Sequence, residues 1–151
     1  MNGNIEQMLR EEGVYVSTTS GYSMWPMLSD RRDRVVLRAV GKETLKKGDL
    51  PLYRRPDGKF VLHRIIGVKR DGVYIIRGDN TYVKEQVPAD WVLGVMTEFY
   101  RKGRRVSEDC VLYRLYAFVW QGIYPIRLLL FRARRAAGRI KRSLLGGGKK
   151  K

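Results

Sequence analysis

Between residues 14 and 100 the chain is a series of short apolar runs, each closed by glycine or aspartate. The runs are rich in β-branched and aromatic residues, which predicts strands at 14–18, 34–40, 50–54, 59–69, 73–77 and 91–100. The pairs Asp57-Gly58 and Asp71-Gly72 are typical of hairpins, because glycine accepts the positive φ of a tight primed turn. Short strands with no long helix among them favour a mainly β fold, a coiled antiparallel sheet or partly open barrel.

The two ends of the chain differ from this central part. Residues 1–12 are polar, with Ile5, Met8 and Leu9 at helical spacing, which predicts a short amphipathic helix and neither a signal peptide nor a membrane anchor. Residues 1–100 hold 16 basic and 13 acidic side chains, whereas residues 101–151 hold 15 basic and 2 acidic ones. The net charge of +16 is therefore concentrated in the last third. We predict a β domain at 1–105, a cationic helical extension at 106–145 and a disordered tail at 146–151.

Residues 111–131 are apolar and aromatic and place five side chains on one helical stripe: Leu112, Leu115, Tyr116, Val119 and Ile123. Pro125 is expected to end or kink this helix, and a second amphipathic segment rich in arginine continues to about residue 145. Proline and arginine make a membrane span costly, whereas tyrosine, tryptophan and arginine among leucines suit a helix lying in the membrane interface. We therefore expect residues 111–145 to contact an anionic membrane surface, so that the protein is membrane-associated and not freely cytoplasmic. Packing against the β domain, or a dimer contact, fits the same pattern equally well.

Few residues can carry catalysis or bind a metal. A single cysteine, Cys110, excludes an internal disulfide framework and a cysteine-rich zinc site, and no metal or other cofactor is implied. His63 is the only histidine, so any mechanism that needs an imidazole must use it. Alternation along its apolar run predicts Val61, His63 and Ile65 on one face of a strand. A lone histidine there is either structural or, beside a serine, a general base.

The candidate nucleophile is Ser23, in the segment Gly-Tyr-Ser-Met-Trp-Pro at residues 21–26. A serine hydroxyl becomes nucleophilic only when a neighbouring base accepts its proton. Gly21 permits an unusual backbone conformation, and Met24 and Trp25 can anchor the turn or line a cleft. Taken alone, the segment is better explained as an ordinary polar turn that contains a serine.

Gly-Asp-Asn at residues 78–80 is a second candidate segment. It is also typical of a plain turn, because aspartate and asparagine hydrogen-bond their own backbone. Its functional reading is that a carboxylate, Asp79, orients the imidazole and stabilises its charged form.

Together these segments resemble type I signal peptidases and the LexA-like self-cleaving repressors that share their fold. Residues 21–26 match the serine box of that superfamily, Gly-x-Ser-Met-x-Pro, and Gly48-Asp49 matches the entry to the next strand. Residues 78–80 match a later Gly-Asp-Asn, and residues 92–95 match the closing motif. His63-Arg64 stands where bacterial members have a lysine, so the chain looks like the Ser-His branch of the endoplasmic reticulum and archaea.

The resemblance implies a serine endopeptidase that cleaves a signal or leader peptide, with Ser23 as nucleophile and His63 as general base. Lys59 is a minor alternative base. In that branch an acidic residue a few positions after Gly-Asp-Asn completes the triad, which implies Glu85, while Asp79 is the family's other important carboxylate. Which of the two orients His63 stays open.

The resemblance also implies a cleft beside Ser23 that accepts an extended peptide with small side chains near the cut. Many members have a second serine that helps hold the oxyanion, but this chain has Gly21 there. Stabilisation would then rest on backbone N–H groups, with Ser20 assisting. The membrane anchor that usually precedes the serine is missing, and the cationic extension is a candidate replacement.

Two other classes of protein fit parts of the sequence. One is a LexA-like regulatory or nucleic-acid-binding protein, which the cationic C-terminal segment favours. No helix-turn-helix pattern precedes the domain, and the basic residues alternate with large aliphatic ones, so nucleic acid is the less favoured partner. The other is a catalytically inactive peptidase fold that acts as a binding module, against which the presence of both Ser23 and His63 argues.

Overall fold

The structure of the chain is a computed structural model that describes residues 3–41 and 43–146, and only the backbone of residues 3, 4, 138 and 140–146. The chain divides into two compact units, Met1–Ala117 and Phe118–Lys151. The sequence placed the boundary at residue 105, whereas the first unit extends to Ala117, into the second of the three helices. All but Gly146 of the tail expected at 146–151 lies outside the described residues.

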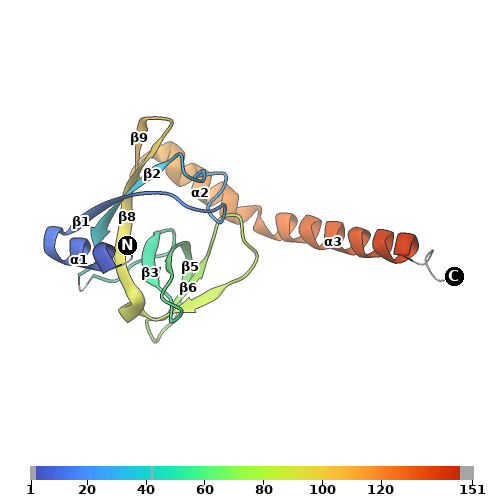
Figure 1. The fold of residues 1–151 in the computed structure, drawn as a ribbon, viewed down its shortest axis with the longest axis horizontal. Coiled ribbons are helices and arrows are strands. Elements are labelled where there is room, and N and C mark those ends of the chain that lie inside the picture. The colour runs from blue at the N-terminus through green and yellow to red at the C-terminus, as the bar shows by residue number, and fades with distance from the viewer. Residues whose placement is uncertain (1–2, 42, 147–151) are drawn as a thin grey trace. The chain divides into compact units, whose positions relative to one another are not determined.

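A six-stranded antiparallel sheet forms most of the first unit (Figure 1). Its order is β1 (Val14–Thr18), β2 (Arg34–Ala39), β8 (Val92–Arg101), β3 (Pro51–Arg54) and β4 (Phe60–Leu62), and β9 (Arg104–Ser107) pairs with β8. The register pairs Val16 with Val36, and the β2–β8 and β3–β8 ladders each contain an irregularity that bends the sheet. This curled sheet confirms the prediction of a mainly β fold with a coiled antiparallel sheet.

A second, three-stranded sheet contains β5 (Arg64–Val68), β6 (Tyr74–Arg77) and β7 (Glu85–Val87), followed by a short 3₁₀ helix, η1 (Ala89–Trp91). The single strand predicted at 59–69 is therefore wrong. β4 belongs to the first sheet and β5 to the second, and His63 is the residue between them. Because the chain changes sheets there, alternation fails, and His63, Arg64 and Ile65 are buried in succession.

Three α-helices complete the described chain: α1 (Gly3–Glu12), α2 (Val111–Gly122) and α3 (Tyr124–Gly146). The predicted short N-terminal helix and C-terminal helical extension are both confirmed. The break falls at Ile123, and Pro125 lies in the first turn of α3, where its missing N–H is tolerated. Within the described residues, neither α2 nor α3 has the length and apolar character needed to cross a bilayer.

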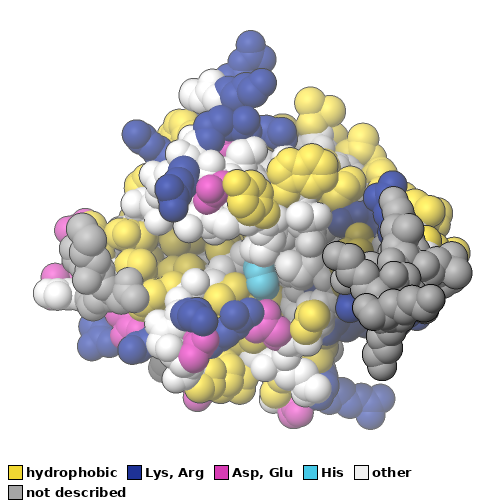
Figure 2. All heavy atoms as spheres, turned by 45° about the vertical axis from the view of Figure 1, so that its right-hand side comes forward, with side chains coloured by type: hydrophobic (Ala, Val, Ile, Leu, Met, Phe, Trp, Pro, Cys, Tyr) yellow, Lys and Arg dark blue, Asp and Glu magenta, His cyan; other side chains and the backbone are white. Residues whose placement is uncertain are grey.

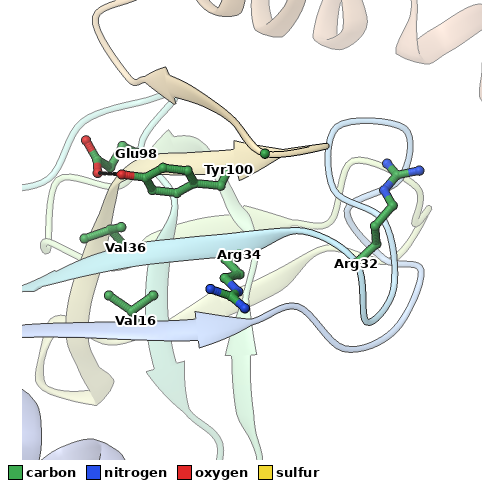
Figure 3. A pocket seen from close by; sticks show the side chains of 7 residues that line it. Val16, Arg32, Arg34, Val36, Glu98 and Tyr100 are labelled. Carbon is green, nitrogen blue, oxygen red and sulfur yellow. Dashed lines mark hydrogen bonds between the residues drawn. The ribbon is translucent and has the colours of Figure 1, made fainter.

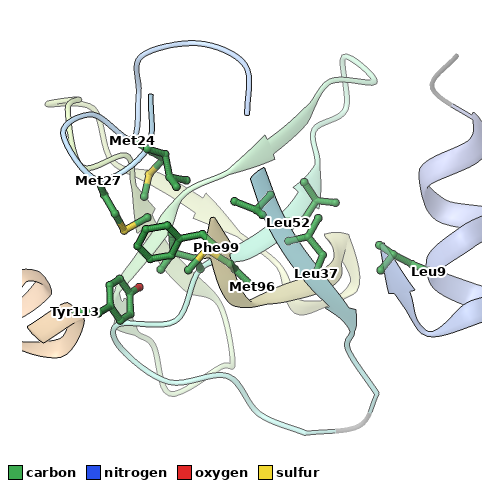
Figure 4. Packing of buried hydrophobic residues seen from close by; sticks show 11 residues of the cluster. Leu9, Met24, Met27, Leu37, Leu52, Met96, Phe99 and Tyr113 are labelled. Carbon is green, nitrogen blue, oxygen red and sulfur yellow. The ribbon is translucent and has the colours of Figure 1, made fainter. Parts of the chain in front are cut away.

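The main hydrophobic core of the first unit joins the sheet to three other segments (Figure 4). Leu9 reaches it from α1, Tyr113 from α2, and Met24 and Met27 from the loop that carries Ser23. The first turns of α2 therefore belong to the folded β unit. The helix packs through Tyr113, which is buried, while Leu112 and Leu115 of the predicted apolar stripe stay exposed.

Candidate active site

The loop between β1 and β2 holds Ser23 in place through both of its ends. Thr19 N–H donates to the carbonyl of Asp33 at 2.9 Å, and Arg31 N–H donates to the carbonyl of Thr19 at 2.8 Å. Gly21 has a φ of 88°, and its N–H donates to Asp30 Oδ1 at 2.7 Å. Met24, which directly follows Ser23, is buried and anchors the loop, so the loop presents Ser23 in a defined position.

Ser23 lines a cavity of about 490 Å³. Four of the predicted site residues share this lining with it: His63, Ser20, Gly21 and Met24. Trp25 does not, and its side chain is half exposed, so it belongs neither to the cleft nor to the core. Among the described residues, the Ser23 hydroxyl and N–H have no hydrogen-bond partner, whereas its carbonyl accepts the Asn80 N–H at 2.7 Å.

The His63 ring lies on the wall of the same cavity and is visible in a hollow of the surface (Figure 2). Its Nδ1 lies 3.4 Å from Glu85 Oε1 and 3.5 Å from Tyr53 Oη. Its Nε2 faces Gly78: a Cβ atom there would lie 3.0 Å from Nε2 and 2.7 Å from the Ser23 carbonyl oxygen. Gly78 thus lies between the edge of the His63 ring and the Ser23 backbone, which together leave no room for a side chain at residue 78.

Burial lowers the pKa of His63 below its usual value of 6.5, although the nearby charge of Glu85 acts in the opposite direction. The imidazole is therefore neutral at pH 7 and able to accept a proton. With Nδ1 facing a carboxylate, we assign the proton of the neutral ring to Nδ1. The lone pair then lies on Nε2, the nitrogen on the Gly78 side.

Glu85 is held in β7 by Arg55, which follows β3. Arg55 Nε and Nη2 donate to the two carboxylate oxygens at 2.7 and 2.6 Å. Partial burial alone would raise the pKa of Glu85, but the hydrogen bonds and charge of Arg55 outweigh it, so that the pKa is lowered. The carboxylate beside His63 is consequently ionised at neutral pH.

Asp79 has a different partner. Its carboxylate accepts Nε and Nη2 of Arg64, both at 2.9 Å, and both side chains are almost fully buried. The helix α2 completes this pair, because Tyr113 Oη accepts Arg64 Nη1 at 2.9 Å and Tyr116 Oη donates to Asp79 Oδ2 at 3.3 Å. A buried ion pair with its remaining hydrogen-bonding positions satisfied is stable, and it fixes the segments that carry it.

These contacts separate the candidates that the sequence left open. Glu85 is the carboxylate next to His63 Nδ1. Asp79 instead pairs with Arg64, the residue that follows His63 in the chain. Lys59, the alternative base, is exposed and pairs with Asp57 at 3.2 Å, outside the cavity lining. Among the described residues, no hydrogen bond joins Ser23 Oγ to the His63 ring, a separation that substrate-free sites often show.

Sequence reasoning missed several residues that build the site. Tyr53 and Arg55 approach His63 and Glu85 from a strand end about 10 to 30 positions away in the chain, and no local pattern marks them. Asn80 was noted only as part of a motif, yet its N–H and side chain hold the carbonyls of Ser23 and Tyr22. Tyr116 on α2 was named only as a member of an apolar stripe, and Tyr113 was not named at all.

A second and larger cavity, of about 610 Å³, lies on the outer face of the curled sheet (Figure 3). Its lining comes from β1, β2 and β8 and includes Val16, Val36, Arg34 and Glu98. Glu98 accepts a hydrogen bond from Tyr100 at 3.2 Å, and the lining contains no serine, cysteine or histidine. Of these two cavities, the smaller one contains the candidate nucleophile and base.

Among the described residues, no group of three His, Cys, Asp or Glu side chains is placed to hold a metal ion. The comparison with protein families found no matching family model, and the search of curated proteins found no match either. The chemical arrangement of the smaller cavity is thus the basis for a functional assignment.

Proposed function

We propose that the chain is a serine endopeptidase with Ser23 as nucleophile and His63 as general base, and that its β unit is of the type I signal peptidase and LexA-like kind. One observation carries the proposal. In a cavity lined by both side chains, His63 turns Nδ1 to a carboxylate and Nε2 to the glycine against which the Ser23 backbone packs. The order of carboxylate, imidazole and serine residue supports the arrangement that acyl transfer requires.

In the proposed mechanism, Nε2 accepts the Ser23 hydroxyl proton while Oγ attacks the carbonyl carbon of a peptide bond. The C–N bond then breaks, and the proton passes from Nε2 to the departing amine nitrogen. Water attacks the resulting ester and gives its proton to Nε2, and Ser23 Oγ leaves and recovers a proton. Glu85 accepts Nδ1–H and stabilises the charged ring in both halves.

The oxyanion of the tetrahedral intermediate needs hydrogen-bond donors that the folded chain has not already used. Gly21 N–H is occupied by Asp30. Ser23 N–H has no acceptor among the described residues and belongs to the nucleophile itself. We assign the oxyanion to Ser23 N–H, with Ser20, which lines the same cavity, as a second donor.

The shape of the cavity supports an extended peptide as substrate. From Ser23 the lining continues along β1, through Ser17 and Tyr15, to Ile5 on α1. Most of this wall is apolar, which suits the apolar stretch of a signal or leader peptide.

The direct test is cleavage of a diverse peptide library, with the new termini identified by mass spectrometry. Wild-type protein should generate them, and Ser23→Ala should lower the rate roughly a thousandfold or more, because the proposed ester intermediate on Ser23 can no longer form. Ser107→Ala, on β9 and outside the cavity, is the matched control and should retain wild-type activity. Cleavage by Ser23→Ala at the wild-type rate would overturn the proposal.

The missing hydrogen bond between Ser23 and His63 favours one alternative, a peptide-binding module without catalysis. The same library distinguishes it. A module would retain peptides on the immobilised protein, equally for wild type and Ser23→Ala, and would generate no new termini.

A further inference from the structure

The outward side of α2 carries an apolar stripe that the fold leaves uncovered. Leu112, Leu115 and Val119 follow one another at intervals of three and four residues, and all are exposed, with Phe118 beside them at 79%. The stripe points away from the core, because Tyr113 on the other side is buried and bonded to Arg64. Isolated exposed apolar residues are common, but a contiguous stripe indicates a binding surface.

The helix α3 has the same character by itself. Ile126, Leu129 and Leu130 are exposed along one side. Arg132, Arg135 and Arg139, again three and four apart, lie on the other side and are exposed as well. A helix with a narrow apolar face and an arginine-rich polar face is typical of the membrane–water interface.

The positive charge of α2 and α3 is not balanced by acidic residues within these two helices. After Asp109 the chain contains 11 arginine and lysine residues and no acidic side chain. Two arginines lie over aromatic rings, Arg127 at 3.9 Å from the centre of Trp120 and Arg135 at 5.6 Å from that of Phe131. Such pairs place a cation and an amphipathic ring at the same level, as at a lipid headgroup layer.

We propose that the apolar stripes of α2 and α3 bind the surface of an anionic lipid bilayer, with their arginines at the lipid headgroups. Nucleic acid would match the charge but would leave Leu115, Phe118 and Leu129 in water. A second copy of the chain would cover the apolar side chains but would bring two cationic segments together. An anionic bilayer satisfies both features.

The test is co-sedimentation of the full chain with phosphatidylserine–phosphatidylcholine vesicles, compared with pure phosphatidylcholine vesicles. We expect strong pelleting with the anionic vesicles and little with the neutral ones. The apolar variant Leu115→Ser/Phe118→Ser/Leu129→Ser should bind at least tenfold more weakly, since burying even one such side chain contributes about a factor of ten. The charge variant Arg132→Gln/Arg135→Gln/Arg139→Gln should lose about fivefold per arginine.

The control Val14→Ser/Val68→Ser removes two exposed valines from the strands of the first unit and should bind as wild type does. Equal pelleting with neutral vesicles, or wild-type binding by the apolar variant, would overturn the proposal. So would tight, salt-dependent binding to a DNA duplex without vesicle binding, or a dimer that the apolar variant abolishes. The assay does not use peptide cleavage, so its outcome is separate from that of the peptidase test.

Discussion

The two compact units carry their charges in opposite ways. In the first unit, Arg64 and Asp79 are almost fully buried and bound to each other, and His63 is buried beside Glu85. In the second, Arg132 and Arg135 are exposed, and the sequence there contains no acidic residue. A buried charge is tolerated only when a partner meets it in a set geometry, so buried pairs fix the positions of the segments they join. An exposed charge fixes nothing within the chain and instead favours an outside partner of opposite sign.

The largest expected effect comes from breaking the buried pair. Asp79→Asn keeps the shape of the side chain but leaves Arg64 charged and unpaired in the core. It should lower the free energy of unfolding by about 3–5 kcal/mol, measured by urea denaturation. Replacing both partners, as Arg64→Met/Asp79→Leu, should recover part of this loss.

An exposed arginine of the second unit provides the matched comparison. Arg134→Gln should change the unfolding free energy by no more than about 0.5 kcal/mol. If Asp79→Asn cost no more than Arg134→Gln, the contrast between the two units would be wrong.

A smaller effect, on activity and not on folding, is expected at Gly78. The Cβ of Gly78→Ala would lie 2.7 Å from the Ser23 carbonyl oxygen and 3.0 Å from His63 Nε2, so the loop and the ring must move apart. A shift of this kind should lower kcat about a hundredfold in the peptide-cleavage assay. Gly67→Ala, in β5, controls for the loss of a glycine, because a Cβ there would make only an ordinary contact, 3.8 Å from Ile75 Cβ. Full activity of Gly78→Ala would contradict the role of this contact.

The smallest effect is expected for Glu85→Gln, which sharpens the distinction between Glu85 and Asp79. His63 must be neutral to act as a base, so activity should fall as the pH is lowered through its pKa, which lies below 6.5. Glu85 raises that pKa, so the glutamine variant should lose activity at a still lower pH.

The plateau activity of Glu85→Gln should drop about tenfold, because Tyr53 Oη also lies near Nδ1 and can hold the ring. The measurement is the pH dependence of kcat/KM. An acidic limb that moved to higher pH would show that Glu85 does not act on His63 as proposed.

Much of the fold could be predicted because its signals are local. Asp-Gly turns and apolar runs placed β1, β2, β3, β6 and β8 within a residue or so of their ends. The break at His63 could not be predicted, since no glycine or proline marks it and its cause is a change of sheet. The short polar strand β7 and the basic strand β9 were missed because pairing with β6 and β8, not composition, creates them.

In the candidate site, too, the features with local sequence signals could be predicted and those that depend on long-range contacts could not. Ser23, His63 and Glu85 could be named from motifs, and the structure places Ser23 and His63 on one cavity and Glu85 beside His63. The choice between Glu85 and Asp79 could not, because it depends on Arg64 taking Asp79 and Arg55 holding Glu85 across long chain separations. Trp25 was expected in the cleft but is exposed to solvent, since Met24 and not Trp25 fills the core beneath the loop.

The position of His63 has a practical consequence for spectroscopy. Because the chain contains one histidine, its imidazole Cε1–H resonance in a proton NMR spectrum belongs to the cavity that Ser23 lines and needs no assignment. Following that single signal during a pH titration gives the pKa of His63 directly, before any substrate has been found. The same signal should shift when a peptide fills the cavity, so it also serves as a label-free reporter in a search for ligands.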